Sequence, residues 1–368
     1  MINRLYVHNY RCFENLDLNF ADNSSVLILG NNGAGKSSLG SVLRILQDIG
    51  KGTNRVRDLL KAGDFSNGRT EVPVRIEISV EIGGRQFDYS IAFEMPEGFK
   101  EARIREESLQ VDGEKIYDRK EAQVDLFVSD SAFMVDWHLV ALPIIQMRGG
   151  DNVIVKFKEW VSRLIIIAPV PSLISGEADG DSLYPDKSVS NFAAWFSGVL
   201  GRYPASWSVI EENLKCMLPD FLDFERIPLG ETANKIVVRF QNKDAQLKLD
   251  LGKLSDGEKC FFICAVLLGA NKYHGPLFCL WDEPDNFLSL SEVGHLILSL
   301  RQSFESSGQI FVTSHNPEAI RKFSNETTLC LARKSHLEPT TARWLSDSNF
   351  RGDLVESLIR GDIPNGSQ

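Results

Sequence analysis

A glycine-rich stretch near the start of the sequence has the residue types and spacing of a phosphate-binding loop. Residues 30–37 read Gly-Asn-Asn-Gly-Ala-Gly-Lys-Ser and fit the pattern G-x-x-x-x-G-K-[ST]. Glycines let such a loop turn tightly, so its backbone N–H groups point at phosphate oxygens, and the following helix adds its positive end. Lys36 is expected to contact the β- and γ-phosphates, and Ser37 to ligate Mg²⁺. The residues predicted to contact the nucleotide here are Asn31, Asn32, Gly33, Ala34, Gly35, Lys36, Ser37 and Ser38.

Two acids stand directly after an apolar run that is typical of a buried strand. Residues 277–281 read Leu-Phe-Cys-Leu-Trp and are followed by Asp282 and Glu283. Asp282 can hold the Mg²⁺ shell, and Glu283 can orient or deprotonate an attacking water molecule. Acids often end strands, so this run alone is only moderately specific. Together with the phosphate loop the signal becomes strong, and it predicts a site that binds and hydrolyses a nucleoside triphosphate with Mg²⁺ as cofactor.

Two further motifs each have a plain structural explanation beside the functional one. Ser255 and Gly257 precede an apolar helix and could form a second anion site at its N-terminus. Ser255 is equally suited to cap that helix, with Glu258 completing a capping box, and both interpretations can hold together. His315 ends the apolar run 310–314 and could reach a γ-phosphate or hold the water, although a lone histidine at a strand end is more often a surface residue.

The elements that must position these residues follow from periodicity. Apolar runs predict strands at 2–9 and 25–30, and a helix is predicted at 36–48. Alternating residues between 70 and 118, with turns at Gly83-Gly84 and Asp112-Gly113, predict antiparallel hairpins. Helices are predicted at 153–167 and 190–200, and strand structure at 236–250. After residue 255 the pattern predicts helix, buried strand, helix and strand.

The predicted fold class is α/β, with a parallel core sheet and an antiparallel β subdomain. The expected organisation is a single unit in four segments. A first lobe spans 1–119, a mostly helical insertion 120–235, a second lobe 236–345 and a C-terminal tail 346–368.

Composition limits the function classes that fit the chain. Hydrophobic residues make up 43% and charged residues 24% of 368, as in soluble globular proteins. The net charge of −10 argues against nonspecific coating of DNA, although a local basic groove stays open. There is no apolar run of the roughly 20 residues that span a membrane, and the N-terminus lacks the apolar stretch of a signal peptide. A cytoplasmic protein without membrane partners is therefore expected.

In their order along the chain, these motifs make the sequence resemble the ABC ATPase superfamily of P-loop NTPases. Residues 30–37 match the Walker A motif, 254–259 the signature, 279–283 Walker B, 285–286 the D-loop and 313–315 the switch histidine. The separation of Walker A and signature is roughly twice that of transporter ATPase subunits, which disfavours a transporter function.

The start of the chain narrows the resemblance. Residues 5–13 look like the N-terminal strand of RecF, SMC and OLD proteins, and this resemblance implies that Arg11 approaches the nucleotide phosphates. The chain looks like the compact OLD-like (AAA_21-like) ATPases. Too few residues follow His315 for a Toprim nuclease domain, so no nuclease activity is expected. Asp256 and the pair Asp285-Asn286 depart from the common signature and D-loop patterns. These departures leave the superfamily assignment intact but do not identify the subfamily.

The resemblance also implies how such a protein works. ATP would close a head-to-head homodimer or higher oligomer, in which the signature of one copy covers ATP held by the other. Hydrolysis would open it, and the output would pass to DNA or to an effector protein, a nuclease or toxin encoded nearby, in bacterial antiphage defence or DNA repair. The alternatives are a non-hydrolysing ATP clamp and, less well supported, an ATPase subunit of a transporter.

Overall fold

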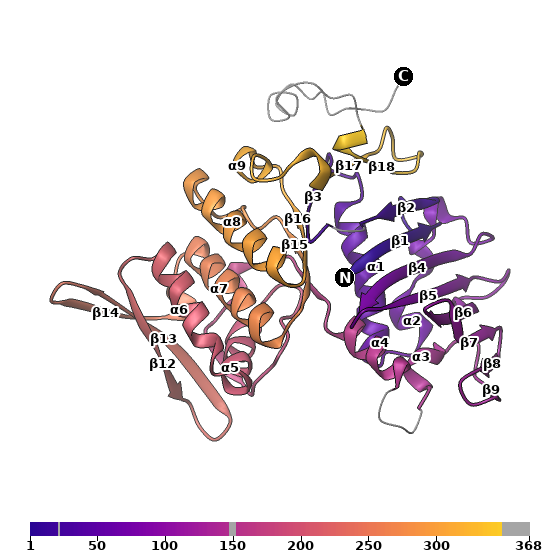
Figure 1. The fold of residues 1–368 in the computed structure, drawn as a ribbon, viewed down its shortest axis with the longest axis horizontal. Coiled ribbons are helices and arrows are strands. Elements are labelled where there is room, and N and C mark those ends of the chain that lie inside the picture. Colours follow the sequence, from indigo (N-terminus) through magenta and orange to yellow (C-terminus); the bar gives the residue numbers. More distant parts are fainter. Residues whose placement is uncertain (21–22, 147–151, 348–368) are drawn as a thin grey trace.

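The computed structural model describes residues 1–20, 23–146 and 152–347, so the expected tail lies outside the described residues from 348 onward. Two lobes flank a central sheet, which Figure 1 shows nearly edge-on between them. The first lobe holds a large antiparallel sheet, and the second is mostly helical with a smaller sheet at its far side (Figure 1). The predicted α/β fold with a parallel core sheet and an antiparallel subdomain is confirmed.

The central sheet has six strands, of which β18 alone runs antiparallel to its neighbour. Its parallel strands consist of nearly continuous apolar residues because both faces of the sheet are covered. In spatial order they are β10 (Ile165–Ile167), β15 (Phe278–Asp282), β16 (Gln309–Thr313), β3 (Ser25–Leu29), β17 (Thr328–Ala332) and β18 (Thr341–Trp344).

Each face of this sheet belongs to a different hydrophobic core. In β15, Phe278 and Leu280 join the core of the first lobe, whereas Cys279 and Trp281 join the core of the second. The same alternation holds along β3, β10, β16 and β17, as expected from the two-residue period of a strand. The central sheet therefore separates the hydrophobic cores of the two lobes and contributes side chains to both.

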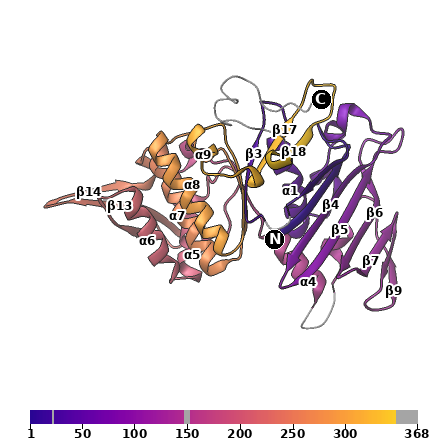
Figure 2. The same ribbon diagram turned by 45° about the horizontal axis from the view of Figure 1, so that its top comes forward.

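The first lobe is built on an eight-stranded antiparallel sheet. The hairpins predicted at Gly83-Gly84 and Asp112-Gly113 are present, as the turns β4–β5 and β6–β7. Helices α1 and α4 pack together beside this sheet (Figure 2). In spatial order the strands are β2 (Leu16–Asn19), β1 (Ile2–His8), β4 (Val74–Ile82), β5 (Arg85–Glu94), β6 (Arg103–Val111), β7 (Glu114–Lys120), β8 (Gln123–Leu126) and β9 (Ser131–Met134).

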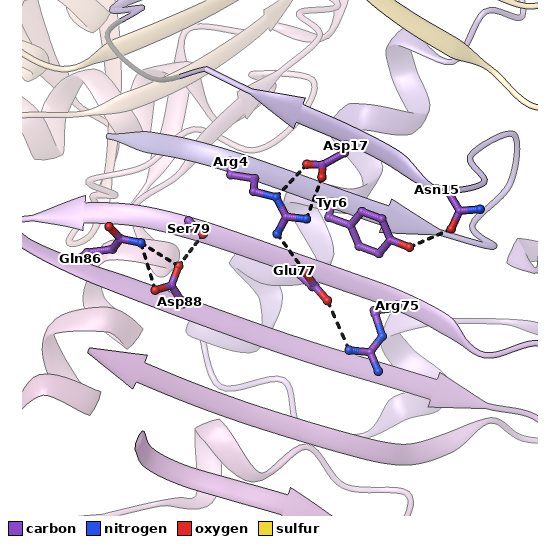
Figure 3. Close-up of polar contacts among 9 residues, drawn as sticks. All are labelled: Arg4, Tyr6, Asn15, Asp17, Arg75, Glu77, Ser79, Gln86 and Asp88. Atoms are coloured by element: carbon purple, nitrogen blue, oxygen red, sulfur yellow. Dashed lines mark hydrogen bonds and ion pairs between the residues drawn. The ribbon is translucent and has the colours of Figure 1, made fainter. Parts of the chain in front are cut away.

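The outer face of this sheet carries a ladder of polar pairs across β2, β1, β4 and β5 (Figure 3). Arg4 donates two hydrogen bonds to Asp17, at 2.8 Å each, and a third to Glu77 at 2.9 Å. Ser79 donates to Asp88 on the neighbouring strand at 2.5 Å. Such cross-strand pairs fix the register of a face that is open to solvent.

The second lobe packs helices against the other face of the central sheet. Helix α7 is buried along nearly its whole length, which explains why its sequence is apolar on all sides. The small sheet consists of β11 (Glu177–Asp179), β13 (Ala233–Asn242), β12 (Phe221–Pro228) and β14 (Ala245–Asp250), and the β13–β14 ribbon projects from the body (Figures 1 and 2). Among the residues that the structure describes, the α-helices are α1 (Lys36–Gly50), α2 (Val56–Leu59), α3 (Ala141–Ile144), α4 (Val153–Ser162), α5 (Phe192–Arg202), α6 (Ser206–Met217), α7 (Asp256–His274), α8 (Leu290–Ser306) and α9 (Pro317–Ile320).

Two predicted elements differ from the structure. The helix predicted at 153–167 ends at Ser162, and Ile165–Ile167 form strand β10. The three isoleucines are β-branched and buried, and they pair in parallel with β15, which makes a strand the better state. The strand structure predicted at 236–250 is two strands, β13 and β14, joined by a turn. Residues 120–235 contain helices α3–α6 and also the strands β8–β12.

Candidate functional site

A cavity of about 410 Å³ opens where strands β3 and β15 end, at the predicted phosphate loop. Its volume lies within the range of small-molecule sites. Residues from both halves of the chain surround it: Arg11, Cys12, Asn31, Asn32, Gly33, Gly35, Lys36, Ser37, Ser38, Asp282, Glu283, Arg333 and His336.

The loop between β3 and α1 needs its glycines for two separate reasons. Gly33 and Gly35 have φ angles of +82° and +104°, the left-handed region that side chains disfavour. A Cβ atom on Gly35 would also lie 2.7 Å from the ring of Phe13 and 2.8 Å from Sγ of Cys12. Both positions therefore favour glycine, and helix α1 begins directly after them without a side-chain cap, which fits a bound phosphate group.

Lys36 begins helix α1 and points into the core of the site. Its buried Nζ donates to the carbonyl oxygen of Gly30 at 2.6 Å and lies 2.8 Å from Nε2 of His315. A lysine ammonium can only donate, so Nε2 of His315 accepts and the ring is neutral. Burial lowers the pKa of both groups, and the neighbouring Lys36 charge lowers the pKa of His315 further. The strand-end histidine is therefore part of the site and not an isolated surface residue.

Oxygen atoms from three elements meet beside Lys36. Ser37 Oγ donates to Oδ2 of Asp282 at 3.3 Å, and Thr313 Oγ1 donates to Oδ1 of the same carboxylate at 2.5 Å. Hydroxyl and carboxylate oxygens are the ligands that Mg²⁺ prefers. The donor set around Ser37 and Asp282 therefore fits the predicted magnesium ion.

Glu283 is held in an unusual backbone conformation, with φ at +52°. Its backbone N–H donates to Oγ1 of Thr313 at 3.0 Å, and its carboxylate accepts from Nδ2 of Asn286 at 2.8 Å. Non-glycine residues in this region of backbone space cluster at functional sites. The next acid, Asp285, is buried, and burial raises the pKa of its carboxyl group.

Arg11 lines the same cavity, as the resemblance implied, but its guanidinium group has partners within the chain. Nε donates to Asp64 and a terminal nitrogen donates to Ser41, both at 2.9 Å. Its positive charge is therefore paired with the negative charge of Asp64. A contact of Arg11 with phosphate stays a prediction.

The predicted signature residues lie elsewhere. Neither Ser255 nor Gly257 is among the described residues that line the cavity. Ser255 caps helix α7, because its hydroxyl accepts from the N–H of Glu258 at 3.3 Å while Glu258 accepts from the N–H of Ser255 at 2.7 Å. Gly257 packs closely on the following loop, where a Cβ would lie 2.9 Å from the carbonyl oxygen of Phe287. The predicted capping box is present, and the anion-binding role stays a prediction.

Three lining residues were not predicted from the sequence as part of the site. Cys12 follows Arg11 in the turn after β1, and Arg333 and His336 lie in the loop between β17 and β18. Cys12 lies in the stretch 5–13 that carries the resemblance, but no role was predicted for it, and Arg333 and His336 belong to no recognisable motif. For Arg333 and His336 the sequence signal is only that they follow an apolar run.

Comparisons with known proteins agree with this geometry. A family model described as the RecF/RecN/SMC N-terminal domain matches residues 1–337. A comparison with curated proteins gave no match. Among the described residues, no helix has both the length and the apolar character needed to cross a membrane.

Solved structures of similar fold cover nearly the whole chain. One is an SMC head bound to the C-terminal winged-helix domain of ScpA, with a TM-score of 0.59 and 12% identity over 94% of this chain and 98% of that chain. Another is an SMC head with an extended coiled coil bound to the C-terminal domain of ScpA derived from Pyrococcus furiosus, with a TM-score of 0.50 and 11% identity over 99% of each chain. At such identities the likeness concerns the fold alone, which is that of an SMC head.

Proposed function

Because the chain belongs to the RecF/RecN/SMC N-terminal domain family, we propose that it is an ATP-hydrolysing molecular switch that closes into a head-to-head dimer. The observation that carries the proposal is the meeting of five side chains at the ends of three core strands. Lys36 and Ser37 follow β3, Asp282 and Glu283 end or follow β15, and His315 follows β16.

Each of these groups has a step that it can perform. Lys36 provides a buried ammonium for the β- and γ-phosphates, with His315 in contact behind it. Ser37 and Asp282 would hold Mg²⁺, which neutralises phosphate charge when bound. Glu283 presents a carboxylate that can orient water or accept its proton. Its fixed backbone and its bond to Asn286 limit where that carboxylate can point.

The dimer part of the proposal rests on the signature. Ser255 and Gly257 lie at a helix N-terminus outside the cavity of their own chain, so they are available to the cavity of a second copy. A two-fold dimer would then contain two composite sites, each with the phosphate loop of one copy and the signature of the other.

A mixing experiment tests this arrangement. Lys36→Ala and Ser255→Arg are made in separate chains, and each homodimer should be inactive. After mixing, one site of every mixed dimer combines an intact Lys36 with an intact Ser255. Random pairing makes about half of the dimers mixed, so up to roughly a quarter of all sites should regain hydrolysis. A chain with Ser289→Arg, at the equivalent cap of α8, serves as the matched control and should keep its activity.

Absence of recovery at every ratio, together with a Glu283→Gln variant that stays monomeric in saturating ATP by light scattering, would contradict the composite site. An ATP clamp without turnover is the alternative function. It predicts tight ATP binding by the unmodified chain with no measurable hydrolysis.

The output of the switch is proposed to be a partner effector or DNA, in a cytoplasmic defence or repair system. An SMC head of similar fold is bound to a winged-helix domain, which supports a protein partner for this chain too. If DNA is read, duplex DNA should bind more tightly with ATP and weaken steeply as salt rises. No DNA binding at low salt, with or without ATP, would leave the protein partner as the output.

A further inference from the structure

The loop from Arg333 to Thr340, between β17 and β18, forms part of the cavity wall through Arg333 and His336. Its far end is fixed to the site by two hydrogen bonds. The buried Thr340 donates from its backbone N–H to the carbonyl oxygen of Cys12 at 2.8 Å. Its hydroxyl donates to the carbonyl oxygen of Ala34, inside the phosphate loop, at 3.0 Å. The loop is therefore anchored to the phosphate loop and to the turn after β1.

Arg333 uses its guanidinium group within this loop. Nε donates to the carbonyl oxygen of Glu338 at 2.8 Å, and a terminal nitrogen donates to the carbonyl oxygen of His336 at 2.6 Å. These bonds use Nε and one terminal nitrogen, so the guanidinium group braces the loop from within. The role of Arg333 is to hold the shape of the loop and thereby the position of His336.

Of the two residues of this loop that line the cavity, His336 is the one with an available side chain. It is exposed and lines the cavity, and within the described residues its ring makes no hydrogen bond or ion pair. An imidazole ring offers a flat face, and such faces stack on nucleobases. The histidine therefore presents a surface that suits the base of a nucleotide more than its phosphates.

The cavity lining contains two chemically different groups of residues. Lys36, Ser37, Asp282 and Glu283 suit phosphate and metal. Arg333 and His336 have no part in that group, and Thr340 ties their loop to Cys12 and Ala34. A volume of about 410 Å³ exceeds what a triphosphate chain alone requires. With the phosphates held by the first group, the rest of the cavity has room for the nucleoside.

We infer that His336 binds the base of the nucleotide by stacking, and that Arg333 is a positioning residue for it. The inference rests on the proposed ATP-binding function and assigns the part of the same cavity that takes the nucleoside. It explains why a loop without any catalytic residue is tied so firmly to the phosphate loop.

The test compares two ligands by calorimetry, ATP and inorganic tripolyphosphate, which has the phosphates but no base. His336→Ala should weaken ATP binding about 5- to 100-fold, the usual effect of losing one stacking partner, and leave tripolyphosphate binding unchanged. His336→Phe keeps a flat ring and should bind ATP nearly as the unmodified chain does. His295→Ala, an exposed histidine on α8, is the matched control and should change neither ligand.

Arg333→Ala should also weaken ATP selectively, by less than His336→Ala, and Arg333→Lys should recover part of the loss because lysine can still donate to the loop carbonyls. An equal loss for both ligands, or no loss for ATP in His336→Ala, would overturn the inference. Failure of the unmodified chain to bind ATP would instead overturn the proposed function. Unchanged ATP binding by His336→Ala would leave that function standing.

Discussion

Two helix N-termini in this protein are candidates for anion binding, and they differ in how their backbone donors are satisfied. Helix α1 begins after Gly35, with no side-chain cap and no acid in its first turn. Helix α7 begins after Ser255 with a complete capping box, and Asp256 and Glu258 stand in its first turn. The first end is open and positive, whereas the second is closed by its own carboxylate.

This difference separates a site that can act alone from one that needs a partner. The open end of α1 can accept a phosphate without losing any existing bond. At α7, an incoming phosphate competes with Glu258, so binding there requires help from elsewhere. A phosphate that is already held by the loop, Lys36 and Mg²⁺ of a second copy would provide that help. The closed cap is thus consistent with a signature that engages only in the dimer.

The largest effect is expected from Glu283→Gln, which removes the carboxylate while leaving both helix ends intact. Because the amide cannot accept a proton from water, the rate of ATP hydrolysis should fall about 10²- to 10⁴-fold. ATP binding should persist, and dimers should accumulate in light-scattering measurements. A variant with the normal rate would exclude Glu283 as the catalytic base.

A smaller but still large effect is expected at the open end. Lys36→Ala removes charge-assisted hydrogen bonds to the phosphates and should weaken ATP binding roughly 10- to 100-fold, with hydrolysis lost as well. Calorimetry measures the affinity, and circular dichroism checks that the fold is kept. The side chain of Lys215 is exposed on α6, far along the chain from the phosphate loop. Lys215→Ala is therefore the control and should bind ATP normally. Unchanged affinity in Lys36→Ala would refute the phosphate-loop assignment.

At the closed end, two serines in matching capping boxes allow a direct comparison. Ser255→Ala on α7 and Ser289→Ala on α8 should each cost about 1 kcal/mol of unfolding free energy, measured by urea denaturation. Only Ser255→Ala should also reduce ATP-driven dimerisation and hydrolysis. If both variants affect hydrolysis equally, Ser255 is a cap and nothing more.

The smallest effect concerns the pH dependence of stability. Burial and the neighbouring Lys36 lower the pKa of His315 below its ordinary value of 6.5, with Glu283, Asp285 and Asp282 opposing the shift. A lowered pKa of a base stabilises the folded state above pH 6.5, and this contribution is lost as pH falls through the folded pKa. The difference in unfolding free energy between the unmodified chain and His315→Asn should therefore shrink between pH 7.5 and 5.5. A constant difference would show that the pKa of His315 is not lowered in the folded protein.

Much of this architecture can be predicted from the sequence, because the decisive signals are local. Strands β15 and β16 are largely apolar and end in a polar residue, and β3 is an apolar run followed by the glycine-rich loop. Parallel strands bring such ends to one edge of a sheet. Lys36, Asp282 and His315 meet for that reason, although their positions span most of the sequence.

The features that escaped prediction depend on distant partners. Ile165–Ile167 continue a helical spacing, and only their pairing with β15, more than a hundred residues later, makes them a strand. His336 carries no motif, and its place in the cavity depends on the bonds from Thr340 to Cys12 and Ala34. Propensity and periodicity contain no information about such contacts.

The alternation of core residues along the central strands has a consequence for folding. Neighbouring side chains such as Leu280 and Trp281 lie in different lobes, so loss of either lobe would strip one face of the same strand. The strands that present Lys36 and Asp282 would then lose their support. Despite the two hydrophobic cores, we therefore expect the described part of the chain to unfold as a single cooperative unit. A nucleotide bound at the ends of these strands would then raise the melting temperature of both lobes together.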